Sequence, residues 1–158
     1  MNLSLAKKII LCVALILILG FLSGFFAGAA NTDWYTTLNK PSFQPPPSVF
    51  GPAWTILYIL IGVSIGLIWH KGIGHENFKL ALKLFGFQFL LNLIWSPVFF
   101  KFQQPLLALI IIIVLWLFIT WTIKVFFTIH KPAGYLLIPY LMWVTFATLL
   151  NASIVYLN

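Results

Sequence analysis

Residues 34–58 read WYTTLNKPSFQPPPSVFGPAWTILY, and this stretch lies between two long apolar runs. It holds five of the nine prolines of the chain, namely Pro41, Pro45, Pro46, Pro47 and Pro52. Each proline fixes its own φ at about −65° and disfavours helix at the residue before it. We therefore predict a stiff, extended segment close to polyproline II, because flexible linkers are built from Gly and Ser instead.

The same stretch carries large apolar side chains that a free loop would not expose to water: Trp34, Tyr35, Phe43 and Phe50. Two interpretations follow. The segment is a preformed lid folded over the mouth of a helical bundle, or it is a rigid connector whose aromatic rings lie at the depth of the lipid headgroups. The loop alone does not distinguish them.

The composition excludes a water-soluble domain, because 62% of the 158 residues are hydrophobic, 7% are charged and the mean hydropathy is +1.06. The net charge of +7 comes from lysines at the ends of the apolar runs. Lysines there can snorkel to the membrane surface, so we expect no nucleic-acid partner. The single Cys12 excludes an intramolecular disulfide.

Five apolar runs predict an all-α membrane protein, a bundle of five transmembrane helices with a proline-rich lid loop between the first and second. The predicted spans cover approximately residues 5–30, 52–70, 80–101, 105–129 and 134–157 of one transmembrane domain, residues 1–158. Lys7 and Lys8 before the first run are also typical of a signal peptide. That run is too long for one, so we expect it to be retained.

The lysines predict the orientation of the bundle. Seven belong to the N-terminus and the second and fourth loops, whereas only Lys40 and Lys101 belong to the first and third. The positive-inside rule then places the N-terminus in the cytoplasm, and the first loop and C-terminus outside, in what we take to be a bacterial plasma membrane.

No Asp, Glu or His lies deep within a predicted span, which argues against an ion pump or proton-coupled carrier. The sequence also lacks metal-ligand spacing, a nucleophile–base pair and a phosphate-binding loop. We therefore expect no metal and no cofactor.

Neutral polar and aromatic residues recur at helical spacing on three spans. The three faces are Trp54, Tyr58 and Gly62; Gln88, Asn92, Trp95 and Phe99; and Tyr140, Trp143, Ala147 and Asn151. Inward faces of this kind suit a flat, apolar, partly polar ligand. The alternative is that the amides only bridge helices while the tryptophans pack.

Glycines at helical spacing predict close helix packing. Gly20, Gly24 and Gly28 share one face of the first span, and Gly62 and Gly66 share one face of the second. Small residues at this spacing let another helix approach, in the same protomer or in a second one.

Two motifs carry a family resemblance in the first half of the chain, and two in the second. They are Trp34-Tyr35-x-x-Leu38-x-Lys40-Pro41-x-Phe43-x-Pro45-Pro46; Val49-Phe50-x-Pro52-x-Trp54-x-x-Leu57-Tyr58; Gln88-x-x-Leu91-Asn92-x-x-Trp95-Ser96-x-x-Phe99-Phe100; and Pro139-Tyr140-x-x-Trp143-Val144-x-Phe146-Ala147-x-x-Leu150-Asn151. In these four motifs the chain resembles the TspO/MBR family. This family comprises the bacterial tryptophan-rich sensory proteins and the mitochondrial translocator protein, also called the peripheral benzodiazepine receptor.

The resemblance implies a five-helix bundle, usually a homodimer, whose first loop caps a pocket for porphyrins, haem-like tetrapyrroles and isoquinoline ligands. It implies that Tyr35, Pro45 and Phe50 belong to the lid. The cavity residues that it implies are Trp54, Tyr58, Asn92, Trp95, Trp143, Ala147 and Leu150.

The main functional hypothesis is a membrane receptor or carrier that binds tetrapyrroles in transport, sensing or scavenging. One alternative is an enzyme that degrades porphyrin with light and oxygen, which the resemblance would assign to Trp54 and Trp143 as catalytic residues. Another is a structural partner in the membrane. Sterol binding is not favoured, because no basic residue follows Tyr156 at the end of the last span.

Overall fold

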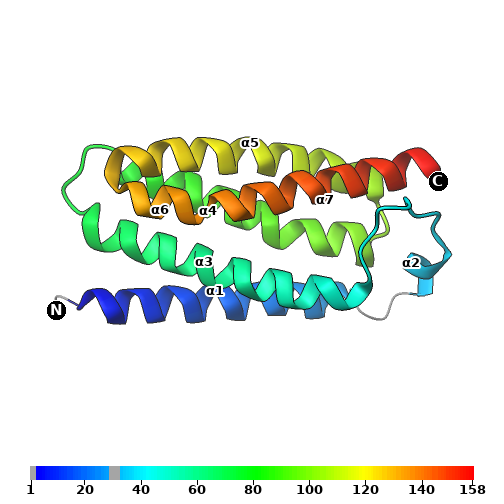
Figure 1. Ribbon diagram of the computed structural model, residues 1–158, viewed down its shortest axis with the longest axis horizontal. Helices are drawn as coiled ribbons and strands as arrows, with labels where there is room; N and C mark the ends of the chain where they lie inside the picture. The colour runs from blue at the N-terminus through cyan, green and yellow to red at the C-terminus, as the bar shows by residue number, and fades with distance from the viewer. Residues whose placement is uncertain (1–2, 29–32) are drawn as a thin grey trace.

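Five long helices form the body of the protein in this computed structural model, which describes residues 3–28 and 33–158 (Figure 1). In chain order the described elements are α1 (Leu5–Ala27), α2 (Asp33–Thr37), the short 3-10 helix η1 (Pro47–Val49), α3 (Phe50–Lys71), α4 (Phe78–Ser96), the π-helical turn η2 (Pro97–Lys101), α5 (Pro105–Ile129), α6 (Lys131–Leu136) and α7 (Ile138–Leu157). No strand occurs within these two ranges, so the predicted all-α fold is confirmed.

Within the described residues, five segments are long and apolar enough to cross a membrane, which confirms the predicted five-helix bundle. They are Leu5–Ala27, Pro47–Lys71, Phe78–Lys101, Pro105–Ile129 and Lys131–Leu157. The chain passes back and forth along the long axis, so its two ends lie at opposite ends of the bundle (Figure 1). We call the end with the C-terminus and the proline-rich loop the lid end, and the other the N-terminal end.

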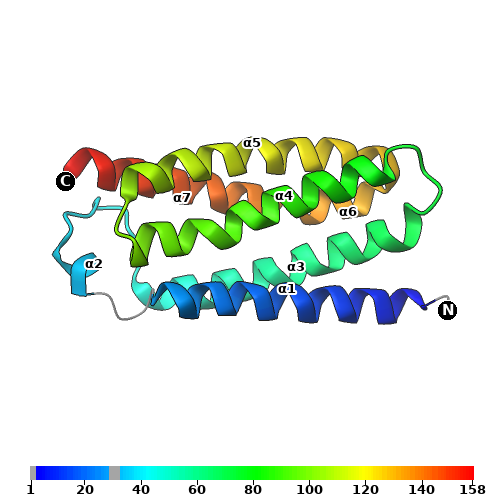
Figure 2. The same ribbon diagram turned by 180° about the vertical axis from the view of Figure 1, so that it is seen from behind.

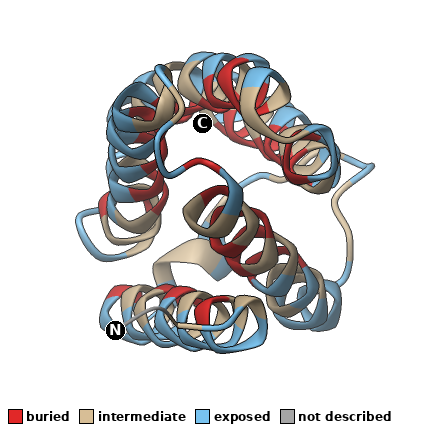
Figure 3. Cartoon of the chain, turned by 90° about the vertical axis from the view of Figure 1, so that its left-hand side faces the viewer, coloured by how far each residue is buried: buried red, intermediate tan, exposed pale blue. Residues whose placement is uncertain are grey.

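The order of helices around the bundle follows from their contacts. α1 packs against α3, α4 against α5, and α5 against α6 and α7 (Figures 1 and 2), while α3 also meets α6. Viewed along the axis, the buried residues face the interior, whereas the outer surface is mostly exposed (Figure 3). That exposed surface is rich in Leu, Ile and Phe, as expected of helices that face lipid rather than water.

Glycines let α1 and α3 approach closely near the N-terminal end. A Cβ atom on Gly62 would lie 2.5 Å from the Cα atom of Val13, and one on Gly66 would lie 2.9 Å from that of Ile9. Closer to the lid end, a Cβ on Gly20 would meet the ring of Tyr58. The close packing predicted for these glycines therefore lies within the protomer.

The first helix is shorter than predicted. It ends at Ala27, because Gly28 adopts a left-handed conformation (φ 61°) and its N–H bonds back to the carbonyls of Gly24 and Phe25. The prediction continued the helix to residue 30, and residues 29–32 lie outside the described part. The second span is longer, since α3 begins at Phe50 and takes Pro52 into its first turn, where a proline costs no hydrogen bond.

The last span contains a bend. It begins at Lys131, three residues before the predicted start, and α6 gives way to α7 at Leu137. Pro139 explains the break, because a proline has no N–H to offer the carbonyl of Tyr135 in the preceding turn.

The prolines predicted a loop that is extended over its whole length before α3, and the structure differs. Residues Asp33–Thr37 form α2, and the hydroxyls of Thr36 and Thr37 donate to the carbonyls of Asp33 and Trp34 at 2.6 and 2.7 Å. No proline occurs before Pro41, so nothing prevents a helical turn here. Between α2 and η1 the chain also makes a turn at Ser42 and Phe43, where the N–H of Gln44 donates to the carbonyl of Pro41 at 3.1 Å. Pro46, just before η1, has the polyproline-like conformation that the prolines predict (φ −55°, ψ 145°).

Candidate ligand-binding cavity

A cavity of about 630 Å³ lies within the lid end of the bundle. Its walls come from α1, α3, α4, η2 and α7, and the loop between α1 and α3 covers its end with Tyr35, Thr36, Gln44 and Pro47. The loop is therefore a lid on the cavity, which decides between the two interpretations that the sequence left open.

One wall is formed by aromatic rings of α3 and α7. The indole of Trp54 stacks on the ring of Tyr58, with centroids 5.3 Å apart, and meets the indole of Trp143 edge-on at 6.5 Å. Phe50, one turn before Trp54, packs edge-on against Trp143 at 5.9 Å. Residues three or four apart share a helix face, so the start of α3 presents all three of its rings on one side.

The opposite wall joins α4 and η2 to the lid. The rings of Trp95 and Phe99 stack with centroids 5.5 Å apart. Tyr35 from α2 packs edge-on against Phe99 at 6.1 Å and against Phe100 at 5.2 Å. Aromatic contacts of this kind hold the lid to the bundle by their packing.

A chain of hydrogen bonds forms the polar floor of the cavity. The O–H of Tyr58 donates to Oδ1 of Asn92 at 3.4 Å, and Nδ2 of Asn92 donates to the hydroxyl of Tyr140 at 3.0 Å. The O–H of Tyr140 in turn donates to Oε1 of Gln88 at 2.9 Å. All four residues are buried, and Tyr58 and Asn92 line the cavity above the other two. The network thus ties α3, α4 and α7 together.

Asn151 makes a second bridge between helices. Nε1 of Trp95 donates to its Oδ1 at 3.1 Å, and its Nδ2 donates to the carbonyl of Pro105 at 2.9 Å. Asn92 and Asn151 both line the cavity as well. The two interpretations of these amides, inward-facing polar groups and bridges between helices, are therefore true together.

Two other residues of the lid hold the side chain of Tyr35 in place. Nε2 of Gln44 donates to the Tyr35 hydroxyl, and Nζ of Lys40 lies 4.7 Å from the centre of the Tyr35 ring. Burial raises the pKa of Tyr35, and the hydrogen bond from Gln44 offsets this only in part. The phenol therefore stays neutral at physiological pH.

Two buried polar atoms of the cavity residues have no hydrogen-bond partner among the described residues. They are Oε1 of Gln44, an acceptor in the lid, and Nε1 of Trp143, a donor in α7. Buried polar atoms without a partner are unfavourable. A ligand that offers one donor and one acceptor would satisfy both.

Most of the predicted site residues come together in this cavity. The lining includes Tyr35, Phe50, Trp54, Tyr58, Asn92, Trp95, Trp143, Ala147 and Leu150. Pro45 is not part of the lining, and Pro47, two residues later, is.

Sequence reasoning missed the wall contributed by α1, which consists of Gly20, Phe21, Ser23, Gly24 and Phe25. The first span is apolar on all sides, so its sequence contains no periodic signal for an inward face. The glycine spacing was the one available indication, and it pointed to helix packing instead.

The lining is neutral throughout, since none of the described residues around the cavity is Asp, Glu, Lys or His. No group of three His, Cys, Asp or Glu side chains that could hold a metal ion occurs in the searched part of the chain. The arrangement is therefore suited to binding an aromatic, largely apolar molecule by stacking, with a few hydrogen bonds to fix its orientation.

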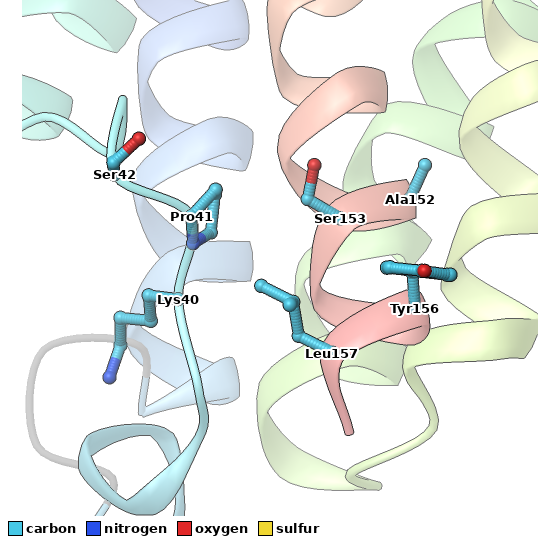
Figure 4. Close-up of a pocket in the computed structure, with 7 residues that line it drawn as sticks. All are labelled: Lys40, Pro41, Ser42, Ala152, Ser153, Tyr156 and Leu157. Atoms are coloured by element: carbon cyan, nitrogen blue, oxygen red, sulfur yellow. The ribbon is translucent and has the colours of Figure 1, made fainter.

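A second, shallow depression lies outside the bundle between the lid loop and α7 (Figure 4). Two of its polar side chains are already engaged: Nζ of Lys40 points away from α7 toward Tyr35 and the carbonyl of Leu38, and the hydroxyl of Ser153 donates to the carbonyl of Leu149. We therefore regard the internal cavity as the functional site.

Comparison with known proteins identifies the family. The sequence profile of the TspO/MBR family matches residues 12–157, nearly the whole chain. The chain belongs to the TspO/MBR family. Tryptophan-rich protein TspO of Chlorobaculum tepidum is 43% identical over 94% of this chain and 94% of its own length. A tryptophan-rich sensory protein of Cereibacter sphaeroides is 39% identical over 80% of this chain and 77% of its own length. The translocator protein of Homo sapiens is 34% identical over 83% of this chain and 78% of its own length.

Membership of the TspO/MBR family, together with five membrane-spanning helices, makes this chain an integral membrane protein. The relatives carry the names of sensory and translocator proteins. These names support a receptor or transport role in the membrane for this member of the family.

Proposed function

We propose that the protein is a membrane receptor or carrier that binds a porphyrin or related tetrapyrrole in the cavity beneath the lid. The observation that carries the proposal is a cavity of about 630 Å³ walled by Trp54, Tyr58 and Trp143. This volume falls within the range of about 300–1,000 Å³ that is typical of small-molecule sites. A flat macrocycle can stack on indole and phenol rings over a large area.

The polar groups of the cavity also fit such a ligand. A pyrrole N–H could donate to Oε1 of Gln44, and a carbonyl or carboxyl oxygen could accept from Nε1 of Trp143, the two atoms that have no partner. Because the lining is neutral, burying a ligand that carries a charge at its centre would be unfavourable. The acidic groups of a tetrapyrrole would therefore lie at the lid end of the cavity, nearest to water. An isoquinoline ligand with one carbonyl group would satisfy the indole of Trp143 in the same way.

We further propose that the lid end faces the outside of a bacterial plasma membrane. Two lysines, Lys40 and Lys101, belong to the loops of the lid end, and the other seven belong to the opposite half. The positive-inside rule then supports a cytoplasmic N-terminus. A homodimer is also part of this proposal. Its support is the family resemblance alone, because Gly20, Gly62 and Gly66 make their contacts within the protomer and so do not indicate a dimer interface.

Titration of the purified protein with protoporphyrin IX in the dark tests the binding proposal. We expect saturable quenching of tryptophan fluorescence and a shift of the porphyrin absorption band, with one equivalent bound per chain. The matched variant is Ala147→Trp, which places an indole on a buried lining position and should abolish binding. If its titration is the same as that of the wild type, the porphyrin binds elsewhere and the proposal fails.

A second candidate function is light-dependent degradation of the porphyrin, with dioxygen as the oxidant. The observation in its favour is that Trp54 and Trp143 meet edge-on at 6.5 Å on the wall of the cavity. Both indoles line the cavity, so next to a bound, excited porphyrin they could act as electron relays between the macrocycle and oxygen. Illumination of the complex in air would then yield a new chromophore, whereas a receptor or carrier would return the porphyrin unchanged.

A further inference from the structure

We propose, on the basis of the binding function proposed above, that the ligand enters and leaves the cavity sideways, from the lipid bilayer, through a gap between α1 and α3. We call this gap the lateral portal. Its rim consists of Phe21, Gly24 and Phe25 on α1 and Gly51 on α3.

The two helices are close near the N-terminal end and separate toward the lid. At Gly62 and Gly66 of α3, an added Cβ would meet the backbone of α1 at 2.5 and 2.9 Å. At Gly20, one step nearer the lid, the nearest atoms are no longer backbone but the ring of Tyr58. At Gly24 and Gly51, no atom of the described residues lies within 4 Å of an added Cβ. The contact between the helices is thus lost in stages.

The two open glycines border the cavity on the side where α1 and α3 face each other. Both Gly24 and Gly51 line the cavity. Tyr58 faces α1, since its ring fills the space at Gly20 and lies 6.3 Å from the ring of Phe21. Gly51 precedes Tyr58 by seven residues, which is two turns, so it lies on the same face of α3. The missing contact is therefore between these two helices.

Two phenylalanines show that the cavity reaches the outer surface at this point. Phe25 is 87% exposed and Phe21 is 51% exposed, yet both line the cavity. They are four residues apart on one face of α1. A side chain can border a cavity and be largely exposed only where the cavity opens. Both residues lie within the first membrane span, so the opening faces lipid.

The other side of α1 is closed at the same level. The hydroxyl of Ser23 donates to the carbonyl of Leu93 in α4 at 2.6 Å. Nζ of Lys101 lies 3.4 Å from the centre of the Phe26 ring, which joins η2 to α1. The lid closes the end of the cavity through Tyr35 and Gln44. No hydrogen bond between described residues crosses the gap on the α3 side, so this route can open without breaking one.

The chemistry of the rim selects what can pass. Two phenyl rings and two glycines offer no charge and no side-chain hydrogen bond, so a hydrated ion gains nothing there. A flat molecule that is dissolved in the acyl chains can cross it without returning to water. We therefore infer that the ligand is drawn from the lipid phase, where a large apolar molecule accumulates.

Association kinetics in lipid nanodiscs test the lateral portal. The probe is protoporphyrin IX delivered in vesicles, and the signal is stopped-flow quenching of tryptophan fluorescence. Gly51→Leu narrows the rim and is compatible with a helix. We expect it to slow association several-fold, because entry must then wait for the helices to move apart. Phe25→Ala widens the rim and should accelerate association.

The matched control is Gly86→Leu. Gly86 is also a helical glycine with no described atom within 4 Å of an added Cβ, but it lies on α4 and does not line the cavity. Its association rate should equal that of the wild type. If Gly51→Leu and Phe25→Ala both associate at the wild-type rate, the portal is refuted, whatever happens to their affinity. If the wild type binds no porphyrin at all, the proposed function itself fails.

Discussion

Asn39 and Asn158 form a reciprocal pair of hydrogen bonds that joins the lid to the end of α7. The backbone N–H of Asn39 donates to Oδ1 of Asn158 at 2.9 Å, and Nδ2 of Asn158 donates to the carbonyl of Asn39 at 3.0 Å. One amide side chain therefore satisfies both polar backbone groups of a residue that lies outside regular structure, just before the first proline of the lid.

This pairing predicts that Asn158→Ala loosens the lid without unfolding the bundle. Loss of two exposed hydrogen bonds costs about 1–2 kcal/mol of lid ordering, so we expect porphyrin affinity to fall about fivefold or more. Hydrogen exchange at the amide of Asn39 should accelerate. The control is Asn77→Ala, which removes a similar exposed bond, from Nδ2 to the hydroxyl of Thr128, at the far end of the bundle. Equal affinities for the two variants would show that the pairing does not hold the lid.

The prolines of the lid should contribute to affinity by limiting the freedom of the free loop. Each proline-to-flexible replacement costs about 0.4–1 kcal/mol when the native conformation suits proline. Replacing Pro45-Pro46-Pro47 by Gly-Ser-Gly should thus weaken porphyrin binding about tenfold or more. The melting temperature of the bundle, followed by far-ultraviolet circular dichroism, should change little. Unaltered binding would mean that the loop is held by its contacts alone.

Tryptophan substitutions separate binding from photochemistry. Phenylalanine keeps an aromatic face, so Trp54→Phe or Trp143→Phe should weaken dark binding by about 1 kcal/mol, which is about fivefold. An indole is far easier to oxidise than a phenyl ring, so illuminated loss of the porphyrin band should fall much further if the protein degrades porphyrin.

The control for this comparison is Trp121→Phe, because Trp121 is exposed on α5 and does not line the cavity. It should match the wild type in both assays. A double Trp54→Phe, Trp143→Phe variant that bleaches porphyrin at the wild-type rate and equal occupancy would remove the support for the enzymatic alternative.

The floor of the cavity should matter more for stability than for binding. Tyr140→Phe removes the hydroxyl that accepts from Asn92 and donates to Gln88, and it leaves buried amide groups unpaired. We expect a loss of about 1–3 kcal/mol in the free energy of unfolding. Tyr58→Phe removes one long bond of 3.4 Å and should cost less. Reversible unfolding in mixed micelles measures both, and the opposite ranking would contradict the network.

The topology prediction is tested by fusions. A fluorescent protein fused after Asn158 should be dark in a bacterial host, and alkaline phosphatase fused there should be active, because the positive-inside rule places the C-terminus outside. The same fusions at the N-terminus should give the opposite result. Fluorescence from the C-terminal fusion would overturn the proposed orientation, and with it the assignment of the lid to the outer surface.

What the sequence determined by itself depends on local properties of the chain. The length of each apolar run predicted five spans, since about 20 residues are needed to cross the hydrocarbon of a bilayer. Helical spacing placed Trp54 and Tyr58 on one face of α3, and Asn92 and Trp95 on one face of α4. Both patterns are readable because they repeat within one helix, and an unpaired amide in lipid is costly enough to predict that it faces inward.

Only the tertiary structure decided how those faces combine. Asn39 and Asn158 are 119 residues apart, so no local pattern connects them. α1 is apolar on all sides, and its inner face is defined by where α3 and α4 approach it. Gly20, Gly24 and Gly28 follow one another at steps of four residues, yet Gly24 borders a cavity and Gly28 ends the helix. The space around a glycine is set by its neighbours in three dimensions. Lipid and the protein interior are equally apolar, so the sequence does not reveal which of them surrounds a given glycine.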